Sequence, residues 1–199
     1  MKPYIIISGL NLRDNNRGTA ALSYGSFYFL HERGLLPKGA KILNVRFVKN
    51  FLRPENRGIK NQKIDIDGTV WEHFTVNVFF IESILLKYLR VCLPFTKFGR
   101  MIKQTEYVAA INGGDGFSDI YSTKTFHSRL SDINLAMIFN IPVILLPQTL
   151  GPFKESKNQI IAGRILRYAS QIFVRDDKFI PELKKMGLKY EQTKDLSFY

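Results

Sequence analysis

Val108–Tyr121, which reads VAAINGGDGFSDIY, is the stretch that decides the fold. Its first four residues, Val108–Ile111, form a short apolar run, as expected of a strand covered on both faces. Gly113, Gly114 and Gly116 follow within five residues and lack the Cβ atom that disfavours positive φ, so the backbone can turn sharply and approach a ligand closely. The stretch therefore predicts a buried strand that runs into a glycine-rich turn.

Two carboxylates, Asp115 and Asp119, lie in this turn. In an open α/β sheet, ligands bind just beyond the carboxyl ends of the strands, which is where the turn is predicted to lie. The alternative is a purely structural turn whose aspartates cap helices, because aspartate is a common cap. Both interpretations remain open from the residues alone.

The whole chain has 199 residues and a formal net charge of +12, with 45% hydrophobic and 23% charged residues. This length and composition suit one large globular domain with a real core. The positive charge favours anionic partners such as phosphorylated substrates or anionic lipid headgroups. Nucleic acid is not expected as a partner, because no stacking or helix-turn-helix motif accompanies the charge.

The single cysteine, Cys92, cannot form a disulfide within the chain, and it lies in an apolar run where core packing is its expected role. The N-terminal apolar run is too short for a signal peptide and predicts a first strand at Tyr4–Ile7. We therefore expect a cytoplasmic location, with the inner membrane surface as a more specific alternative.

The segment after this first strand is polar and turn-prone, and a helical pattern begins at Gly18. A loop that enters a helix presents free N–H groups and the positive end of the helix dipole to an anion. Asn16 and Gly18 are thus candidate binding residues. The simpler alternative is that Asn16 or Thr19 caps the helix.

Alternating strand and helix patterns continue to the end of the chain. Further strands are predicted at residues 41–47, 142–146 and 171–174, and helices at about 125–140, 155–170 and 179–186. This alternation predicts an α/β fold over residues 1–199, a Rossmann-like doubly wound parallel sheet. The loops Gly9–Gly18, Gly113–Asp119, Gln148–Gly151 and Arg175–Asp177 would then share one edge of the sheet.

Two segments interrupt the alternation. Residues 49–69 contain Lys49, Arg53, Arg57, Lys60 and Lys63 and predict a mobile basic loop, or a solvated excursion with no partner. Residues 74–98 are the most apolar and predict a helix. Charged residues within that run argue against a membrane span. The helix either packs on the sheet or rests on a membrane surface with basic residues on its wet face.

Several common site motifs are absent from the sequence. There is no G-x-G-x-x-G, G-x-x-x-x-G-K-[ST] or G-x-S-x-G, and the three histidines do not cluster with cysteine at metal-binding spacing. No metal and no cofactor are therefore expected.

Four segments together resemble the polysaccharide pyruvyl transferase family, in order and over nearly the whole chain. They are NRGTAAL at Asn16–Leu22, INGGDGFSDIY at Ile111–Tyr121, LPQTLGPF at Leu146–Phe153 and FVRDDKF at Phe173–Phe179. The resemblance implies transfer of a pyruvyl group from phosphoenolpyruvate to two hydroxyls of a sugar, as a ketal. Two departures concern substrate details: Phe179 stands near the place of a usual serine, and Thr19 stands where an acidic residue is frequent.

This chemistry assigns roles to the candidate residues. A sugar hydroxyl must lose a proton, so a carboxylate base is useful, with Asp119 as the first candidate and Asp115 as the second. Arg175 offers a planar fork to phosphate or carboxylate, and its alternative role is an ion pair with Asp176 or Asp177. Gln148 either holds a sugar hydroxyl or ties its loop down.

The remaining substrate contacts are predicted at the loop backbone of Asn16, Gly18, Gly113 and Gly114. The expected partners are phosphoenolpyruvate and a glycan or lipid-linked saccharide, with peripheral membrane contact. The resemblance covers the N-terminal half of a family whose fold resembles two-domain glycosyltransferases, so we expect that a C-terminal domain is absent and that this chain alone does not transfer pyruvate. The alternative is a non-catalytic module that binds a nucleotide-sugar or an anionic glycan.

Overall fold

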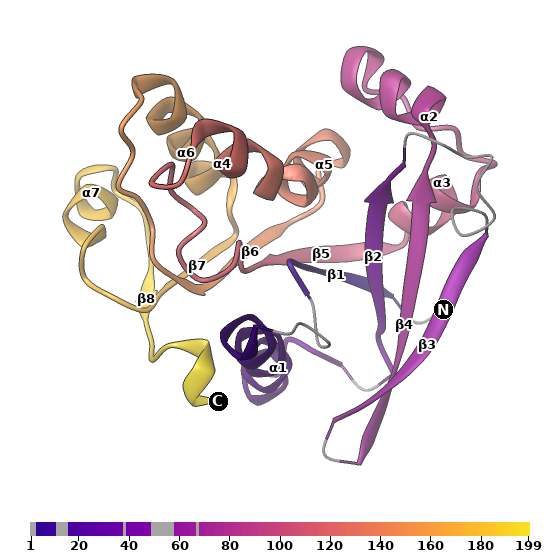
Figure 1. Cartoon of the computed structure of the whole chain (residues 1–199), viewed down its shortest axis with the longest axis horizontal. Coiled ribbons are helices and arrows are strands. Elements are labelled where there is room, and N and C mark those ends of the chain that lie inside the picture. Colours follow the sequence, from indigo (N-terminus) through magenta and orange to yellow (C-terminus); the bar gives the residue numbers. More distant parts are fainter. Residues whose placement is uncertain (1–2, 11–15, 38, 49–57, 67) are drawn as a thin grey trace.

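A single twisted sheet organises the molecule in the computed structural model, which describes residues 3–10, 16–37, 39–48, 58–66 and 68–199. The sheet has eight strands in the order β3-β4-β2-β1-β5-β6-β7-β8 (Figure 1). The strands are β1 (Tyr4–Ser8), β2 (Lys41–Phe47), β3 (Ile59–Ile66), β4 (Thr69–Val78), β5 (Thr105–Ala110), β6 (Val143–Gln148), β7 (Gln171–Val174) and β8 (Glu191–Gln192). Neighbouring strands are parallel, except that β3 runs antiparallel to β4.

Helices cover both faces of this sheet. They are α1 (Arg17–Glu32), α2 (Phe80–Ile84), α3 (Lys97–Ile102), α4 (Thr123–Arg129), α5 (Ser131–Phe139), α6 (Ser156–Tyr168) and α7 (Ile180–Lys185). A π-helical turn, η2 (Leu85–Leu89), continues α2, and a 3₁₀ turn, η3 (Leu196–Phe198), lies near the C-terminus. This arrangement confirms the predicted α/β, Rossmann-like doubly wound sheet.

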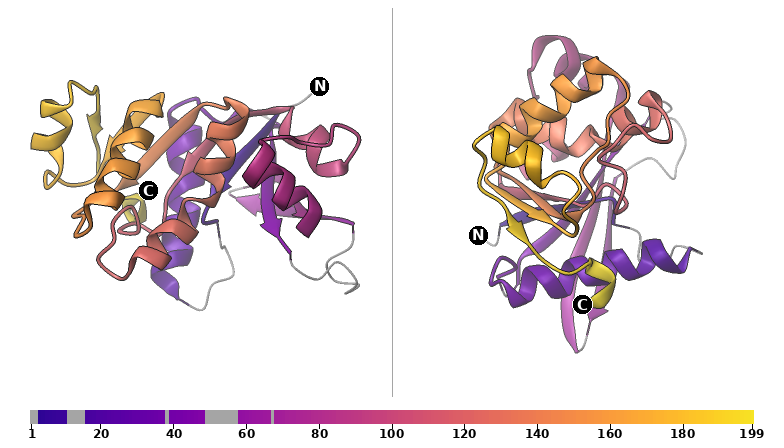
Figure 2. Two further views of the ribbon diagram at one scale, coloured as in Figure 1. Left: turned by 90° about the horizontal axis from the view of Figure 1, so that it is seen from above. Right: turned by 90° about the vertical axis from the view of Figure 1, so that its left-hand side faces the viewer.

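Alternate side chains of the strands build a separate core on each face. Ile6 packs with side chains of α3 to α7, whereas its neighbours Ile5 and Ile7 pack with α1 and η3. Figure 2 shows α1 on one side of the sheet and the later helices on the other. All three isoleucines are at most 3% exposed, and full burial of such a side chain contributes about 1.5–3 kcal/mol. Two buried faces explain why the central strands are almost wholly apolar.

The strand order places a switch point at the centre of the sheet. From β1 the chain proceeds to β2 and on to the edge strand β3, and β4 then pairs between β3 and β2. The chain next crosses to β5 on the other side of β1 and proceeds outward through β6, β7 and β8. The loops after β1 and β5 therefore diverge from adjacent strand ends. A crevice forms at such a point, beyond the carboxyl ends of the strands.

The predicted basic loop is wrong for its second part. Residues 59–66 form the edge strand β3, which pairs with β4 along its whole length, from Ile59 opposite Val76 to Ile66 opposite Thr69. The turn between them includes Gly68, whose φ is +74° and whose N–H donates to Asp65 Oδ1 at 2.9 Å. Lys60 and Lys63 are exposed on this strand. The predicted cations Lys49, Arg53 and Arg57 lie outside the described residues.

The predicted helix over residues 74–98 is also wrong for its first part. Its apolar start belongs to β4, and the helical turns α2 and η2 span only residues 80–89. They end at Arg90, which adopts the left-handed conformation at φ 53°. Among the described residues, no helix combines the length and the apolar character that a membrane crossing needs.

The other elements lie close to their predicted places. β5, β6, β7, α6 and α7 match the predicted segments within a few residues. The helix expected at 125–140 is two shorter helices, α4 and α5, which meet at Leu130. The two-residue strand β8 was not predicted.

Candidate active site

A cavity of about 850 Å³ lies at the switch point, between the loops that follow β1 and β5. Its walls come from these two loops, the starts of α1 and α5, the end of α4, and the segments after β7 and β8. The lining residues are Ser8, Gly9, Asn16, Gly18, Thr19, Leu22, Asn112, Gly113, Asp115, Tyr121, Ser128, Arg129, Ser131, Asp132, Arg175, Asp195 and Ser197.

The glycine-rich turn forms the floor of this cavity with the conformation that its sequence predicts. Gly113 and Gly114 have φ values of +71° and +81°, which L side chains rarely adopt. Gly116 has no space for a side chain, because a Cβ atom there would lie 1.9 Å from the Asn112 carbonyl oxygen and 2.1 Å from Arg129 Nη1. A Cβ on Gly114 would lie 3.1 Å from Arg175 Nη1. The glycines thus let the guanidinium groups of Arg129 and Arg175 approach the turn.

Asn112, the first residue of the turn, is the most unusual polar group in the cavity. Its side chain is 2% exposed, and neither Oδ1 nor Nδ2 has a hydrogen-bond partner among the described residues. A buried polar group without a partner costs roughly 1–3 kcal/mol. A cavity-lining amide in this state is well suited to a ligand that offers both an acceptor and a donor.

Arg129 forms the first cationic group of the site. Its Nη1 lies 3.8 Å from Asp115 Oδ1, and its guanidinium carbon lies 5.5 Å from the centre of the Tyr121 ring. The Tyr121 hydroxyl donates to Asp115 Oδ2 at 2.6 Å, and this hydrogen bond raises the pKa of Tyr121. Arg129, Asp115 and Tyr121 thus fix one another's positions in the wall of the cavity.

Arg175 forms the second cationic group, at the carboxyl end of β7. Its Nε donates to Thr149 Oγ1 at 2.9 Å, and its Nη1 lies 2.5 Å from Asp195 Oδ2. Asp176 is more distant, at 3.9 Å from Nε. The ion pair that the sequence suggested as an alternative therefore exists, but its close partner is Asp195 rather than Asp176.

Asp195 in turn fixes the C-terminal segment. Its Oδ1 accepts hydrogen bonds from the backbone N–H and the hydroxyl of Ser197, both at 2.8 Å. Burial alone would raise the pKa of Asp195, but the bonds from Ser197 and Arg175 outweigh it and lower the pKa below its ordinary value. Asp195 is therefore held as a carboxylate.

Asp132 differs from Asp195 in that its pKa is raised and not lowered. It lies in the first turn of α5, lines the cavity and hydrogen-bonds with the hydroxyl of the buried Ser8. Desolvation raises the pKa of Asp132 from 3.8 to about 6, against the lowering effect of the Ser8 hydrogen bond. A carboxyl group with a pKa near neutrality can both accept and return a proton.

The start of α1 forms the opposite wall. Asn16 is the N-cap, and its Oδ1 accepts the N–H of Gly18 at 3.0 Å. The capping role that the sequence left open therefore belongs to Asn16 and not to Thr19. Both Asn16 and Gly18 also line the cavity, so the helix start faces the site.

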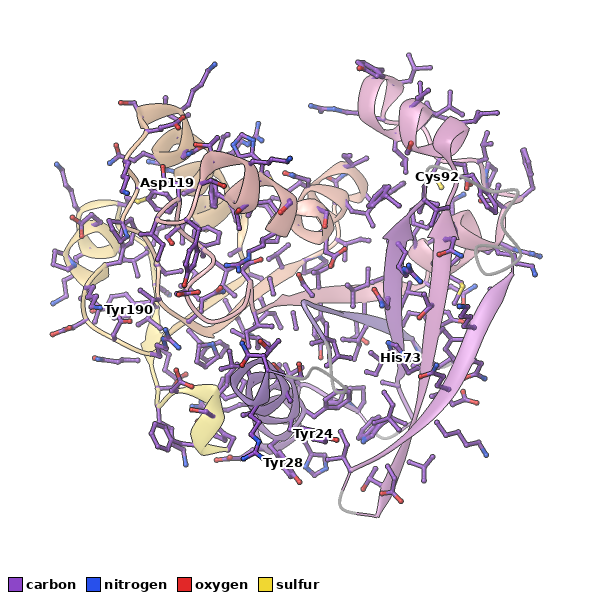
Figure 3. All side chains as sticks on the ribbon, in the orientation of Figure 1. Tyr24, Tyr28, His73, Cys92, Asp119 and Tyr190 are labelled. Atoms are coloured by element: carbon purple, nitrogen blue, oxygen red, sulfur yellow. The ribbon has the colours of Figure 1, made fainter. Side chains whose placement is uncertain are left out.

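Asp119, the first candidate base, does not line the cavity. It is 4% exposed, and its carboxylate accepts the N–H groups of Lys154 at 2.7 Å and Glu155 at 3.0 Å, together with Asn158 Nδ2 at 2.9 Å. Burial alone would raise its pKa, but these hydrogen bonds together lower it. Figure 3 shows Asp119 beside α4 and α6, on the side of the sheet away from α1. The geometry favours the capping interpretation, at the start of α6.

Gln148 is likewise buried outside the cavity. It is fully buried, and its Nε2 donates to the Ala110 carbonyl oxygen at 3.0 Å. This bond ties the end of β6 to the end of β5, which is the loop-fixing role that the sequence left open. Five of the predicted residues line one cavity: Asn16, Gly18, Gly113, Asp115 and Arg175. Gly114 lies next to the guanidinium group of Arg175. Asp119 and Gln148 support the surrounding loops.

Sequence reasoning assigned no site role to several polar residues of the cavity, among them Asn112, Tyr121, Arg129, Asp132 and Asp195. Arg129 and Asp132 lie on α4 and α5, a region where the sequence predicts a single helix packed on the sheet. Both side chains line the cavity because the helix is interrupted at Leu130. Within the described residues, no group of three or more histidine, cysteine, aspartate and glutamate side chains is arranged to hold a metal ion.

A comparison with models of known protein families identifies the family that the chain resembles. The family model of polysaccharide pyruvyl transferases matches residues 16–199. No curated protein matches the chain significantly. The matched range includes every cavity-lining residue except Ser8 and Gly9.

Proposed function

Because the chain belongs to the polysaccharide pyruvyl transferase family, we propose that its central cavity binds phosphoenolpyruvate beside the sugar that receives the pyruvyl group. The observation that carries this proposal is the buried Asn112 amide, which lies without a protein partner in a cavity that also holds Arg129 and Arg175. Phosphoenolpyruvate carries a phosphate and a carboxylate, which require two sets of cationic or N–H donors.

The two arginines are suited to these two anionic groups. Each presents a planar fork of donors that matches phosphate or carboxylate oxygens. They come from different elements, α4 and the end of β7, and both lie against the glycine turn. The turn N–H groups and the Asn112 amide would complete the contacts to a donor held between them.

The reaction has simple proton requirements. One sugar hydroxyl loses its proton and bonds to the central carbon of phosphoenolpyruvate, whose methylene carbon gains a proton and becomes a methyl group. A second hydroxyl of the sugar then displaces phosphate, which leaves with the remaining proton. The products are the pyruvyl ketal and inorganic phosphate, so the site must accept and return protons.

Asp132 is the carboxyl group whose environment best suits this task, since its pKa of about 6 lies close to neutrality. Asp115, the second carboxylate that the sequence suggested, lines the same cavity and is paired with Arg129 and Tyr121. We assign Asp115 to orienting Arg129 and Asp132 to proton transfer. Asp119, with its three hydrogen bonds outside the cavity, supports the fold in this proposal.

Calorimetric titration of the chain with phosphoenolpyruvate tests the donor site. Arg175→Gln and Arg129→Gln should each weaken binding roughly tenfold or more, because each removes charge-assisted hydrogen bonds. Arg164→Gln is the matched control, since Arg164 is exposed on α6 outside the cavity. Unchanged affinity in both cavity variants, with their folds intact by circular dichroism, would refute the donor site.

A second assay separates transfer from simple binding. The chain is incubated with phosphoenolpyruvate and a panel of galactosides, mannosides and N-acetylhexosaminides, and ketal products are sought by mass spectrometry. Product that depends on Asp132 supports the full proposal. Binding of a nucleotide-sugar or an anionic glycan, with no affinity for phosphoenolpyruvate, would support the binding module instead.

A further inference from the structure

A second unusual surface lies at the carboxyl end of β4, away from the central cavity. Here α2 and η2 project from the sheet and lead into an irregular segment before α3 (Figure 1). Large apolar side chains remain in contact with solvent: Ile81 and Tyr88 are each 69% exposed, Leu89 is 64% exposed and Phe95 is 73% exposed. Single exposed apolar residues are ordinary, but such a cluster marks an interaction surface.

A hollow opens within this surface. It has a volume of about 880 Å³, and its apolar wall includes Val76, Phe79, Ile81, Leu93 and Phe95. Lys97 and Arg100, in α3, stand at its rim. An apolar hollow with a basic rim fits a molecule that has an anionic group next to a hydrocarbon region.

The exposed charges of the segment have one sign, although the buried Glu82 also lines the hollow. Between residues 79 and 103 the basic residues are Lys87, Arg90, Lys97, Arg100 and Lys103, whereas the single acidic residue, Glu82, is buried. Arg90, Lys97 and Arg100 are exposed, and within the described part of the chain they form no salt bridge. The apolar residues are therefore flanked by cations that carry no internal counter-charge.

We propose that residues 79–100 form a docking surface for an anionic lipid bilayer. The exposed apolar side chains enter the headgroup region, and Arg90, Lys97 and Arg100 contact lipid phosphates. A second copy of the chain is a poorer occupant, because a symmetric contact would bring the same cations together in a molecule whose net charge is already +12.

The position of this surface suits a membrane-bound acceptor. Strands β1, β2, β4 and β5 are parallel neighbours, so the segment after β4 and the cavity beyond β1 and β5 lie at the same edge of the sheet. A bilayer on this surface would bring a lipid-linked saccharide to the edge where the cavity opens. Vesicle binding itself is independent of the proposed donor and is measured separately.

Flotation of the purified chain with two kinds of vesicle tests the proposal. Vesicles of phosphatidylcholine and phosphatidylglycerol in equal amounts should bind the chain, and vesicles of phosphatidylcholine alone should bind it far more weakly. Raised salt should weaken binding to the anionic vesicles, because exposed charges are screened. Phosphoenolpyruvate titration of the same preparations reports separately on the central cavity.

Matched variants locate the contact. Phe95→Ser and the pair Lys97→Gln with Arg100→Gln should each weaken binding to anionic vesicles roughly tenfold. The controls are Ile160→Ser on α6, where Ile160 is also 73% exposed, and the pair Lys184→Gln with Lys185→Gln on α7. The controls should bind vesicles like the original chain.

Three results would overturn the proposal. The first is the absence of binding to anionic vesicles, and the second is equal weakening by the control variants. The third is a stable dimer in analytical ultracentrifugation that Phe95→Ser dissociates while vesicle binding is unaffected, which would assign the surface to a second copy.

Discussion

At the scale of single residues, the structure contrasts two carboxyl groups, Asp132 in the cavity and Asp119 outside it. Asp119 is held by three hydrogen bonds that favour its charged form, whereas Asp132 has only Ser8 against the desolvation of its carboxyl group. The surroundings therefore shift their pKa values in opposite directions. Such a separation is how a fold assigns a structural role to one acid and a proton-transfer role to another.

Asp119→Asn should destabilise the protein and retain donor binding. The change removes the charge that accepts two backbone N–H groups and the Asn158 amide, so we expect a loss of about 1–3 kcal/mol in the free energy of unfolding. The lowered pKa means that this stabilisation is present above pH 3.8 and disappears as pH falls through the folded-state value. Urea titrations at neutral and acid pH measure it. A stable variant without transfer activity would return Asp119 to catalysis.

Asp132→Asn should have the opposite effect on stability. The pKa of Asp132 is higher in the folded chain, so the folded state binds the extra proton between pH 3.8 and about 6, and stability falls as pH rises through that range. The amide carries no charge to desolvate, so the variant should be more stable than the original at pH 7.5 and equally stable at pH 3.5. Thermal unfolding at the two pH values tests this. Transfer activity should fall by about a hundredfold.

Asn112→Ala separates ligand binding from folding. Because the Asn112 amide has no hydrogen-bond partner among the described residues, its removal should not lower the free energy of unfolding and should raise it by up to about 1–3 kcal/mol. Phosphoenolpyruvate affinity should nevertheless fall by roughly tenfold, the value of one lost hydrogen bond to a charged ligand. Titration calorimetry and urea unfolding of the same sample measure both quantities. A large loss of stability with unchanged affinity would make Asn112 a structural residue.

At the scale of elements, the packing of α1 on the C-terminal segment controls the geometry around Arg175. A Cβ atom on Gly25 would lie 1.9 Å from the Leu196 carbonyl oxygen, so a glycine in α1 lets η3 lie directly against the helix. Leu196 follows Asp195, the carboxylate partner of Arg175. The helix therefore determines where this ion pair lies.

Gly25→Ala should displace η3 and lower the melting temperature, although alanine is the better helix former. Gly163→Ala is the matched control in α6, where the nearest atom to a new Cβ is the end of the flexible Arg167 side chain at 3.4 Å. The control should be neutral or more stable by up to about 1 kcal/mol. Calorimetric scans compare the two. Equal melting temperatures would show that η3 does not constrain α1.

The sequence predicts elements where their patterns are unambiguous. β5 and the glycine turn were predictable, because a short apolar run followed by three glycines is compatible with few structures other than a buried strand and a tight turn. β3 was not, because its side chains are mostly exposed and read as polar loop, and the sheet edge requires no apolar face. Residues 74–78 read FTVNV and belong to a strand. Their alternation of apolar and polar side chains has the period of a strand, but the continuous apolar residues that follow hide the boundary between strand and helix.

The candidate site was predictable only as a set of loops. Strand order brings Asn16, Gly113 and Arg175 together, and this follows from the alternation of strands and helices. Whether Asp115 or Asp119 faces the cavity depends on the path of a single turn, which periodicity does not determine. Asp195 reaches Arg175 from the next segment of the chain, a contact that only the folded structure reveals.

At the scale of the whole molecule, ligand binding at the switch point should stabilise the entire sheet, because both halves of the sheet contribute to the cavity. Phosphoenolpyruvate at about a hundred times its dissociation constant should raise the free energy of unfolding by about 2.7 kcal/mol. Thermal shift measurements over a concentration series detect this, and Arg175→Gln should remove it at the same concentrations. Inorganic phosphate serves as the comparison for non-specific anion effects.

The Arg175–Asp195 ion pair makes this binding a competition within the protein. The chain places its own anion on the cation that a donor would use, so an incoming phosphate or carboxylate exchanges with Asp195 instead of occupying a vacant group. Release of Asp195 would also release the hydrogen bonds that hold Ser197. Donor binding in the cavity would then be detected outside it, as faster proteolysis of the last residues of the chain.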